Sequence, residues 1–209
     1  MINTVGTVFC CQAGQTRALH QDQKGVMNRL RWTVLILLCF LAAPAADLSA
    51  EQNISVGYGF GVANARLREG SLEDGRYYDF WQIAYSYEKA FWKDEKRWWK
   101  DIAFYVTPFV AYVTSPNDGF EGGAIIGTKW YFLNRGQTRV YLDVGVGGAY
   151  SSIDFDMQKS HLVFILTGAF GLTYKSFFIE DRFRHYSNAG TSSPNRSINA
   201  NIVSVGMYF

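Results

Sequence analysis

The stretch Ile54-Ser55-Val56-Gly57-Tyr58-Gly59-Phe60-Gly61-Val62 decides the fold, because large apolar residues alternate along it with glycine and serine. A repeat of two residues is typical of a β-strand, whose successive side chains point to opposite faces. One face of this strand is therefore bulky and apolar, and the other face is small. We predict a strand whose two faces meet different environments.

The same alternation recurs through the rest of the chain. Bulky apolar residues oppose glycine, alanine or threonine in three further stretches, and four more strands are predicted from similar but less regular segments. With the first strand, these predictions cover residues 52–62, 77–88, 102–113, 122–132, 139–150, 161–174, 177–187 and 198–209. The chain is thus predicted to be all-β, with eight strands.

The residues on the two faces of the predicted strands indicate a membrane protein. In a soluble β-sandwich, the face opposite the apolar one is polar. Here the second face is mostly glycine, alanine, serine and threonine, with isolated charges. Small residues suit the crowded interior of a narrow barrel, and large apolar residues suit lipid. We predict an eight-stranded antiparallel transmembrane β-barrel. A soluble lipocalin-like barrel is the alternative.

Aromatic residues gather at the predicted strand ends, at Trp130, Tyr131, Phe132, Tyr208 and Phe209. Such clusters are typical of the interfacial girdles of outer-membrane barrels. The terminal strand, 203–209, also resembles the C-terminal signal of bacterial outer-membrane barrels, in which the assembly machinery reads a terminal aromatic residue. We therefore predict a location in the bacterial outer membrane, and assembly through the strand that ends at Phe209.

The first fifty residues read as a targeting segment. Met27 is followed by the basic residues Arg29 and Arg31 and then by the apolar run 32–42, which is typical of a signal peptide. The predicted parts of the chain are an upstream extension over 1–26, a signal peptide over 27–50 and the barrel domain over 51–209. An uncleaved membrane anchor is the alternative for the second part.

The composition excludes several classes of protein. The chain has 209 residues, 18% of them charged, and its formal net charge of +2 is too small to indicate nucleic acid as a partner. No stretch after residue 50 offers about 18 consecutive apolar residues, which excludes a bundle of transmembrane helices. All three cysteines, Cys10, Cys11 and Cys39, precede residue 50. The only histidines after residue 50 are His161 and His185. We expect no disulfide, metal or cofactor in the barrel domain.

An even number of strands predicts that both barrel termini face the periplasm. The short connections 133–137 and 174–176 then lie on the periplasmic side. The predicted outer connections are 64–76, 114–121, 151–161 and 188–197. The tryptophan-rich segment 90–100 is long for a periplasmic turn, and two interpretations stay open for it. It forms either an amphipathic segment on the membrane surface or a distorted hairpin.

The segment Arg182-Phe183-Arg184-His185-Tyr186-Ser187-Asn188-Ala189-Gly190 bears on function. His185 and Ser187 are two residues apart on one strand, so they share the predicted lipid face with Phe183. They are poor lipid anchors but suit chemistry on a lipid, with histidine as general base and serine as nucleophile. An ordinary interfacial pair is the alternative.

Because side chains fill so narrow a lumen, diffusion through the barrel is not expected. Two function classes remain: a structural or adhesive barrel, and a membrane enzyme.

The motif His-Tyr-Ser-Asn-Ala-Gly at 185–190, followed by Pro194-Asn195 and a final aromatic strand, resembles the PagL-type lipid A 3-O-deacylases. The resemblance is close over about 181–209. Over 52–209 it extends only to the length, the number of strands and the abundance of glycine and aromatic residues. It implies an outer-membrane serine esterase that removes the acyl chain at position 3 of lipid A, so that lipopolysaccharide is the expected partner. The sequence leaves open whether the protein forms a homodimer.

The resemblance also implies roles for individual residues. Ser187 matches the nucleophile and His185 matches the base of a Ser–His–acid triad on the outer barrel surface. Asn188 and the backbone N–H groups near Ala189 and Gly190 are the candidate oxyanion-hole donors.

The third member of the triad departs from the family pattern. The family has a glutamate twelve residues after the serine, and here that position is Asn199. Asparagine can orient a histidine ring, but it supplies no negative charge. Asp181 shares the face of His185 but lies roughly 13 Å along the strand, too far for direct contact. Asp154 and Asp156 in an outer connection are the remaining candidates. The chain is either an active deacylase or a degenerate member of the family.

Overall fold

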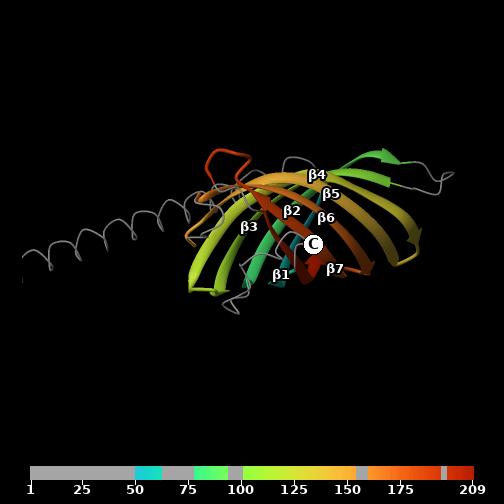
Figure 1. Cartoon of the computed structure of the whole chain (residues 1–209). Coiled ribbons are helices and arrows are strands. Elements are labelled where there is room, and N and C mark those ends of the chain that lie inside the picture. The colour runs from blue at the N-terminus through green and yellow to red at the C-terminus, as the bar shows by residue number, and fades with distance from the viewer. Residues whose placement is uncertain (1–49, 63–77, 94–100, 154–159, 194–196) are drawn as a thin grey trace, which may run out of the picture. The chain divides into compact units, whose positions relative to one another are not determined.

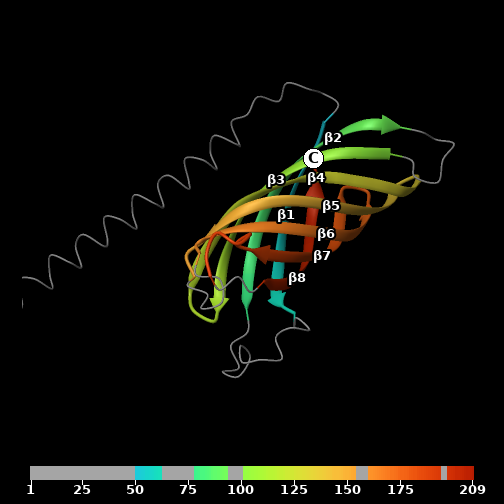
Figure 2. The ribbon, with the colours of Figure 1, turned by 45° about the horizontal axis from the view of Figure 1, so that its top comes forward.

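The computed structural model describes residues 50–62, 78–93, 101–153, 160–193 and 197–209, and their strands form one closed antiparallel barrel. Each strand pairs with the next along the chain (Figure 1). Strand β8 pairs with β1 and closes the sheet. Figure 2 shows β7 and β8 side by side from a second direction. The strands are β1 (Ala50–Gly61), β2 (Asp79–Lys93), β3 (Asp101–Ser115), β4 (Gly119–Arg135), β5 (Thr138–Ser151), β6 (Leu162–Tyr174), β7 (Phe177–Ser187) and β8 (Ile198–Tyr208).

The eight-stranded antiparallel barrel predicted from the sequence is confirmed. Strand β1 begins at Ala50, one residue before the predicted start of the barrel domain. The predicted extension 1–26 and all of the predicted signal peptide but its last residue lie outside the described residues. Among the residues that the structure describes, no helix is long and apolar enough to cross a membrane.

The bulky apolar face points outward. On β6, for example, the side chains of Leu162, Phe164 and Leu166 are more than half exposed. The small face points inward because the lumen has no room for more: a Cβ atom added at Gly59 would lie 2.1 Å from the ring of Phe80. The outer surface therefore suits lipid, and the inner surface forms the packed core.

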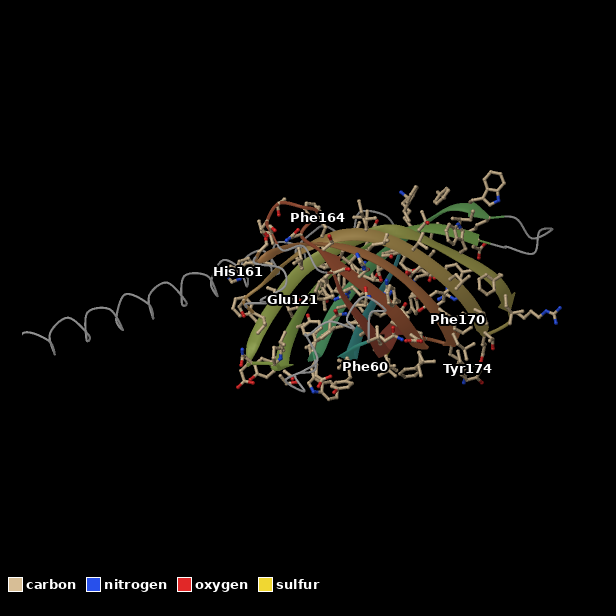
Figure 3. The ribbon with its side chains drawn as sticks, viewed as in Figure 1. Phe60, Glu121, His161, Phe164, Phe170 and Tyr174 are labelled. Atoms are coloured by element: carbon tan, nitrogen blue, oxygen red, sulfur yellow. The ribbon has the colours of Figure 1, made fainter. Side chains whose placement is uncertain are left out.

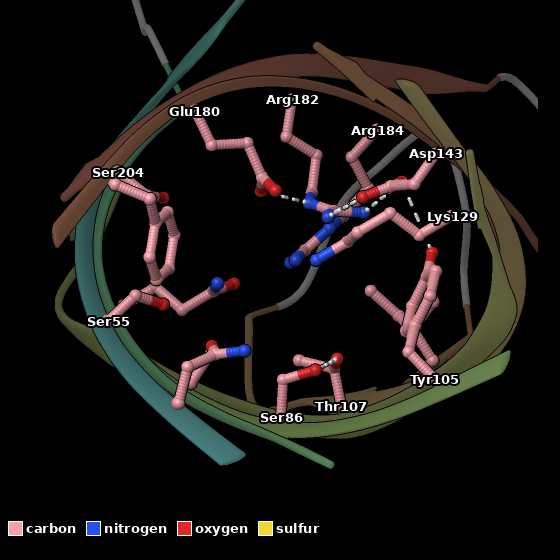
Figure 4. Close-up of a pocket in the computed structure, with 15 residues that line it drawn as sticks. Ser55, Ser86, Tyr105, Thr107, Lys129, Asp143, Glu180, Arg182, Arg184 and Ser204 are labelled. Atoms are coloured by element: carbon pink, nitrogen blue, oxygen red, sulfur yellow. Dashed lines mark hydrogen bonds and ion pairs between the residues drawn. The ribbon is translucent and has the colours of Figure 1, made fainter. Parts of the chain in front are cut away.

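The charges that are scattered singly along the small face of the strands are paired with one another inside the barrel. Arg182 bridges Asp143 at 2.6 Å and Glu180 at 2.8 Å, and Lys129 pairs with Glu88. Figure 4 shows the guanidinium of Arg182 between Glu180 and Asp143 inside the barrel. The alternation of side chains places each charge inside, but it does not reveal which charges meet across the lumen. These pairs bring distant strands together and stabilise the buried charges against the cost of removing them from water.

A small cavity lies beside these ion pairs. Its volume is about 30 Å³, which is room for about two water molecules. Its walls differ, with Arg182, Arg184 and Lys129 on one side and the hydroxyls of Ser55 and Ser204 away from them (Figure 4).

Two residues of the predicted aromatic girdle are placed differently from the prediction. Tyr131 and Tyr208 are 3% and 9% exposed, and both point into the lumen, where their hydroxyls donate to Glu88 at 2.7 and 3.1 Å. The girdle prediction was wrong for them because it considered position along the strand and ignored the phase of the alternation. Phe209, in contrast, is 68% exposed on the outer surface.

Part of the tryptophan-rich segment 90–100 belongs to the β-sheet. Its first residues belong to β2 and pair with β3 down to Lys93 and Asp101, with a bulge between Ala90 and Trp92. This pairing agrees with the distorted hairpin rather than with a surface segment over 90–93. Residues 94–100 lie outside the described part of the chain, as does the segment 154–159.

Candidate functional site on the outer face of strands 7 and 8

Strand β7 carries two different rows of side chains. Arg182, Arg184 and Tyr186 are buried in the lumen, whereas His185 and Ser187 are on the outer face and are partly exposed. The alternation continues from the apolar residues lower on the strand, so that the polar pair lies at the end of a lipid-facing row. This placement agrees with the prediction that His185 and Ser187 share the lipid face.

Asn199 lies directly opposite His185. The two residues are partners in the β7–β8 register, and His185 Nδ1 is 2.7 Å from Asn199 Oδ1. The amide oxygen can only accept, so this contact places the ring proton on Nδ1 and leaves Nε2 with its lone pair. The structure therefore brings together the two side chains that the family resemblance had paired.

Ser187 is the last residue of β7, at the end of the barrel whose connections are predicted to face outward. Its Oγ accepts a hydrogen bond of 3.1 Å from the backbone N–H of Ala189. Ala189 has a φ of 52°, in the left-handed region that non-glycine residues rarely adopt. Local strain of this kind is common at functional sites. It aims one backbone donor at the serine hydroxyl.

The turn that follows is built around Asn188. This side chain is fully buried, and its Nδ2 donates to Ser192 O at 3.0 Å and to Ser192 Oγ at 2.8 Å. Its Oδ1 accepts from the N–H of Gly190 at 2.9 Å. Of the three predicted oxyanion donors, the Asn188 amide and the Gly190 N–H are thus engaged within the turn. The Ala189 N–H is the candidate that points to Ser187.

The surroundings of the polar residues are apolar. Phe164 pairs with Ser187 across the β6–β7 ladder, and Leu166 pairs with His185. Figure 3 shows Phe164 near the same end of the barrel as His161, with Phe170 and Tyr174 towards the opposite end. An ester whose acyl chain lies along this outer surface would present its carbonyl to the hydroxyl of Ser187.

Of the other acidic candidates, the structure describes only Asp181, which is not in contact with His185. Asp181 lies lower on β7, opposite Val203, and its Oδ1 accepts a long hydrogen bond of 3.4 Å from Asn201 Nδ2. Asp154 and Asp156 lie outside the described residues. In the described part of the chain, no group of three histidine, cysteine, aspartate or glutamate side chains is placed to hold a metal ion.

Two residues of the site region had been missed. Ser192 holds the buried amide of Asn188, and Asn201 continues the row of Asn199 towards Asp181. The second could have been found from the period of two on β8, since positions 199 and 201 share a face. The first carries no pattern in the sequence, because the turn that brings it back is not periodic.

Comparison with known proteins identifies relatives of this barrel. Residues 81–208 match the family model described as lipid A 3-O-deacylase (PagL). The crystal structure of the outer-membrane enzyme PagL superposes with a TM-score of 0.57 at 17% identity, covering 75% of this chain and 98% of the other. The structure of Neisserial surface protein A gives a TM-score of 0.50 at 12% identity, covering 77% and 96%. At these identities the structural likeness shows the fold. A search of curated proteins found no match.

Proposed function

Because the chain belongs to the PagL family of lipid A 3-O-deacylases, we propose that this outer-membrane barrel is itself an active serine esterase that hydrolyses the acyl chain at position 3 of lipid A. The observation that carries the proposal is the hydrogen bond between His185 and Asn199, two residues below Ser187 on the outer face. The location of the site at the lipid-facing end of β7 suits a substrate whose acyl chains lie in the outer leaflet.

In the proposed reaction, Ser187 Oγ attacks the ester carbonyl of lipid A, and His185 Nε2 takes the hydroxyl proton. The imidazolium then gives that proton to the departing sugar oxygen, so that the C–O bond of the ester breaks and an acyl-enzyme forms. Water repeats the sequence and releases the free fatty acid. Each half of the reaction begins with Nε2 as the base, and Nε2 then returns the proton as the acid. The Asn199 contact favours the tautomer with a free Nε2 lone pair.

Asn199 is proposed to orient the His185 ring without neutralising its charge. An amide oxygen accepts the Nδ1 proton, but it stabilises the imidazolium less than a carboxylate would. The loss on exchanging the triad aspartate of a serine protease for asparagine is about 10⁴ in turnover. We expect slower hydrolysis here than with a carboxylate at position 199.

The oxyanion is proposed to lie near the Ala189 N–H, which is 3.1 Å from Ser187 Oγ. When Oγ bonds to the carbonyl carbon, the carbonyl oxygen comes close to the same donor. Asn188 then acts as a positioning residue, because its buried amide holds the turn that sets the direction of this N–H.

The proposal is tested by mass spectrometry of lipid A from cells with and without the protein. We expect a lipid A species that lacks one ester-linked acyl chain only when the wild-type protein is present. Ser187→Ala, expressed to the same level and folded to the same extent, is the matched control and is expected to leave lipid A intact. If wild-type protein changes no lipid A species, the chain is a degenerate deacylase that serves as a structural or adhesive barrel.

A further inference from the structure

A carboxylate lies on the lipid-facing surface near the middle of β7. Asp181 follows the outward phase of Ile179 and Phe183, which are 51% and 44% exposed, and it is itself exposed. An ionisable side chain facing lipid at this depth is costly, and such residues are usually retained for function. Its position therefore calls for an explanation that packing does not give.

The carboxylate is connected to a polar row that leads to the site. Asn201 donates to Asp181, and Asn199 contacts His185, so two asparagines on one face of β8 lie between the carboxylate and the imidazole. We call these four residues the polar stripe. The residue between them on β7, Phe183, pairs with Asn201.

The groups that face the polar stripe from the neighbouring strands are apolar. On β6, Phe170 is opposite Asp181 and Leu166 is opposite His185. On β8, Val203 is opposite Asp181. Among the described residues on the outward face of β6, β7 and β8, Asp181 is the charged group that accompanies the histidine. The field of this carboxylate thus reaches His185 without a competing charge from these strands.

Resting on the proposed esterase function, we propose that Asp181 is a positioning residue that supplies, from a distance, part of the negative charge that Asn199 lacks. The His185 imidazolium forms only as Ser187 is deprotonated, so a nearby negative charge stabilises the transition state more than the ground state. Asp181 and His185 are roughly 13 Å apart along β7. At this distance and an effective dielectric constant of about 20, Coulomb's law predicts that the carboxylate raises kcat about tenfold. Mobile ions do not screen this interaction inside the lipid as they do in water.

The experiment measures deacylation of lipopolysaccharide by purified protein in one detergent, with kcat and KM determined separately. Asp181→Asn and Asp181→Ala should each lower kcat about tenfold and leave KM unchanged, because both remove the charge. Asp181→Glu keeps the charge and should retain most of kcat. Asp79→Asn is the matched control, since Asp79 is an outward carboxylate at the start of β2, separated from β7 by β1 and β8. It should behave as wild type.

The outcomes separate this inference from the function on which it rests. If wild type and Ser187→Ala release equal amounts of fatty acid, the proposed function fails before Asp181 is considered. If wild type is active and Asp181→Asn is equally active, the charge has no role and the inference is overturned. A loss in Asp181→Ala alone, or a change confined to KM, also overturns it, because these results indicate a contact rather than a field. Heat-modifiable migration on gels verifies that each variant is folded.

Discussion

The two faces of β7 place polar side chains under opposite conditions. On the inner face, Arg182 is surrounded by carboxylates at 2.6 and 2.8 Å and is almost completely buried. On the outer face, the described structure gives His185 a single polar partner, Asn199, and apolar neighbours on β6. The inner groups are paired from several strands and serve stability, whereas the polar groups on the outer face of β7 and β8 form the polar stripe, which leads to Ser187. Polar residues on the lipid side of a barrel therefore identify function more reliably than those in the lumen.

The largest effect is expected on the outer face. Ser187→Ala and His185→Ala should each lower the rate of ester hydrolysis by at least about a thousandfold, because the nucleophile and its base act as a unit. Neither side chain supports the lumen, so the thermal unfolding temperature should stay close to that of wild type. The rates are measured on purified protein with lipopolysaccharide, and folding is checked by heat-modifiable migration. Activity retained in Ser187→Ala would move the nucleophile elsewhere.

Position 199 is expected to give the next largest effect. Asn199→Glu should raise turnover by tens to thousands of times, within the scale of about 10⁴ set by the protease aspartate-to-asparagine exchange. Asn199→Ala should lower turnover further, because the ring loses its acceptor at 2.7 Å. Both variants are compared with wild type in matched detergent. A glutamate variant that is no faster, together with an alanine variant that is no slower, would show that Asn199 is not the third member.

The inner face should respond in stability rather than in rate. Arg182→Met removes the cation from Asp143 and Glu180 and leaves two buried carboxylates uncompensated, which typically costs about 3–5 kcal/mol. Urea unfolding in detergent should show this loss, while the turnover of the folded fraction stays near the wild-type value. Equal stability with a large loss of turnover would contradict the division between the two faces.

Removal of Phe209 should have the smallest effect on the folded barrel. Its N–H donates to Gln52 O at 3.0 Å, and its ring is 68% exposed, so the purified barrel should lose only about 1 kcal/mol of stability. In cells, the amount of heat-modifiable protein in the outer membrane should fall severalfold if the terminal ring is read during assembly. An unchanged amount in cells would contradict recognition of the terminal aromatic ring during assembly.

Period-two alternation was enough to predict which residues face lipid, because a strand admits only two faces. The resemblance to the deacylase family singled out Asn199, and the alternation placed it on the outward face, where the register now pairs it with His185. The sequence could not indicate that Tyr131 and Tyr208 bond Glu88, because that contact joins strands far apart in the chain. The turn around Asn188 was also beyond prediction, since its hydrogen bonds follow from local backbone geometry rather than from a repeat.

The most direct test of the central claim is to label the nucleophile. A long-chain alkyl fluorophosphonate enters the outer leaflet and forms a phosphorus–oxygen bond with an activated serine, releasing fluoride while the base takes the hydroxyl proton. Mass spectrometry of the digested protein should then find the phosphonate on Ser187 in the wild type, greatly reduced labelling in His185→Ala and none in Ser187→Ala. A wild-type protein that stays unlabelled, or a label on another residue that persists in Ser187→Ala, would contradict an esterase site on the outer face of β7.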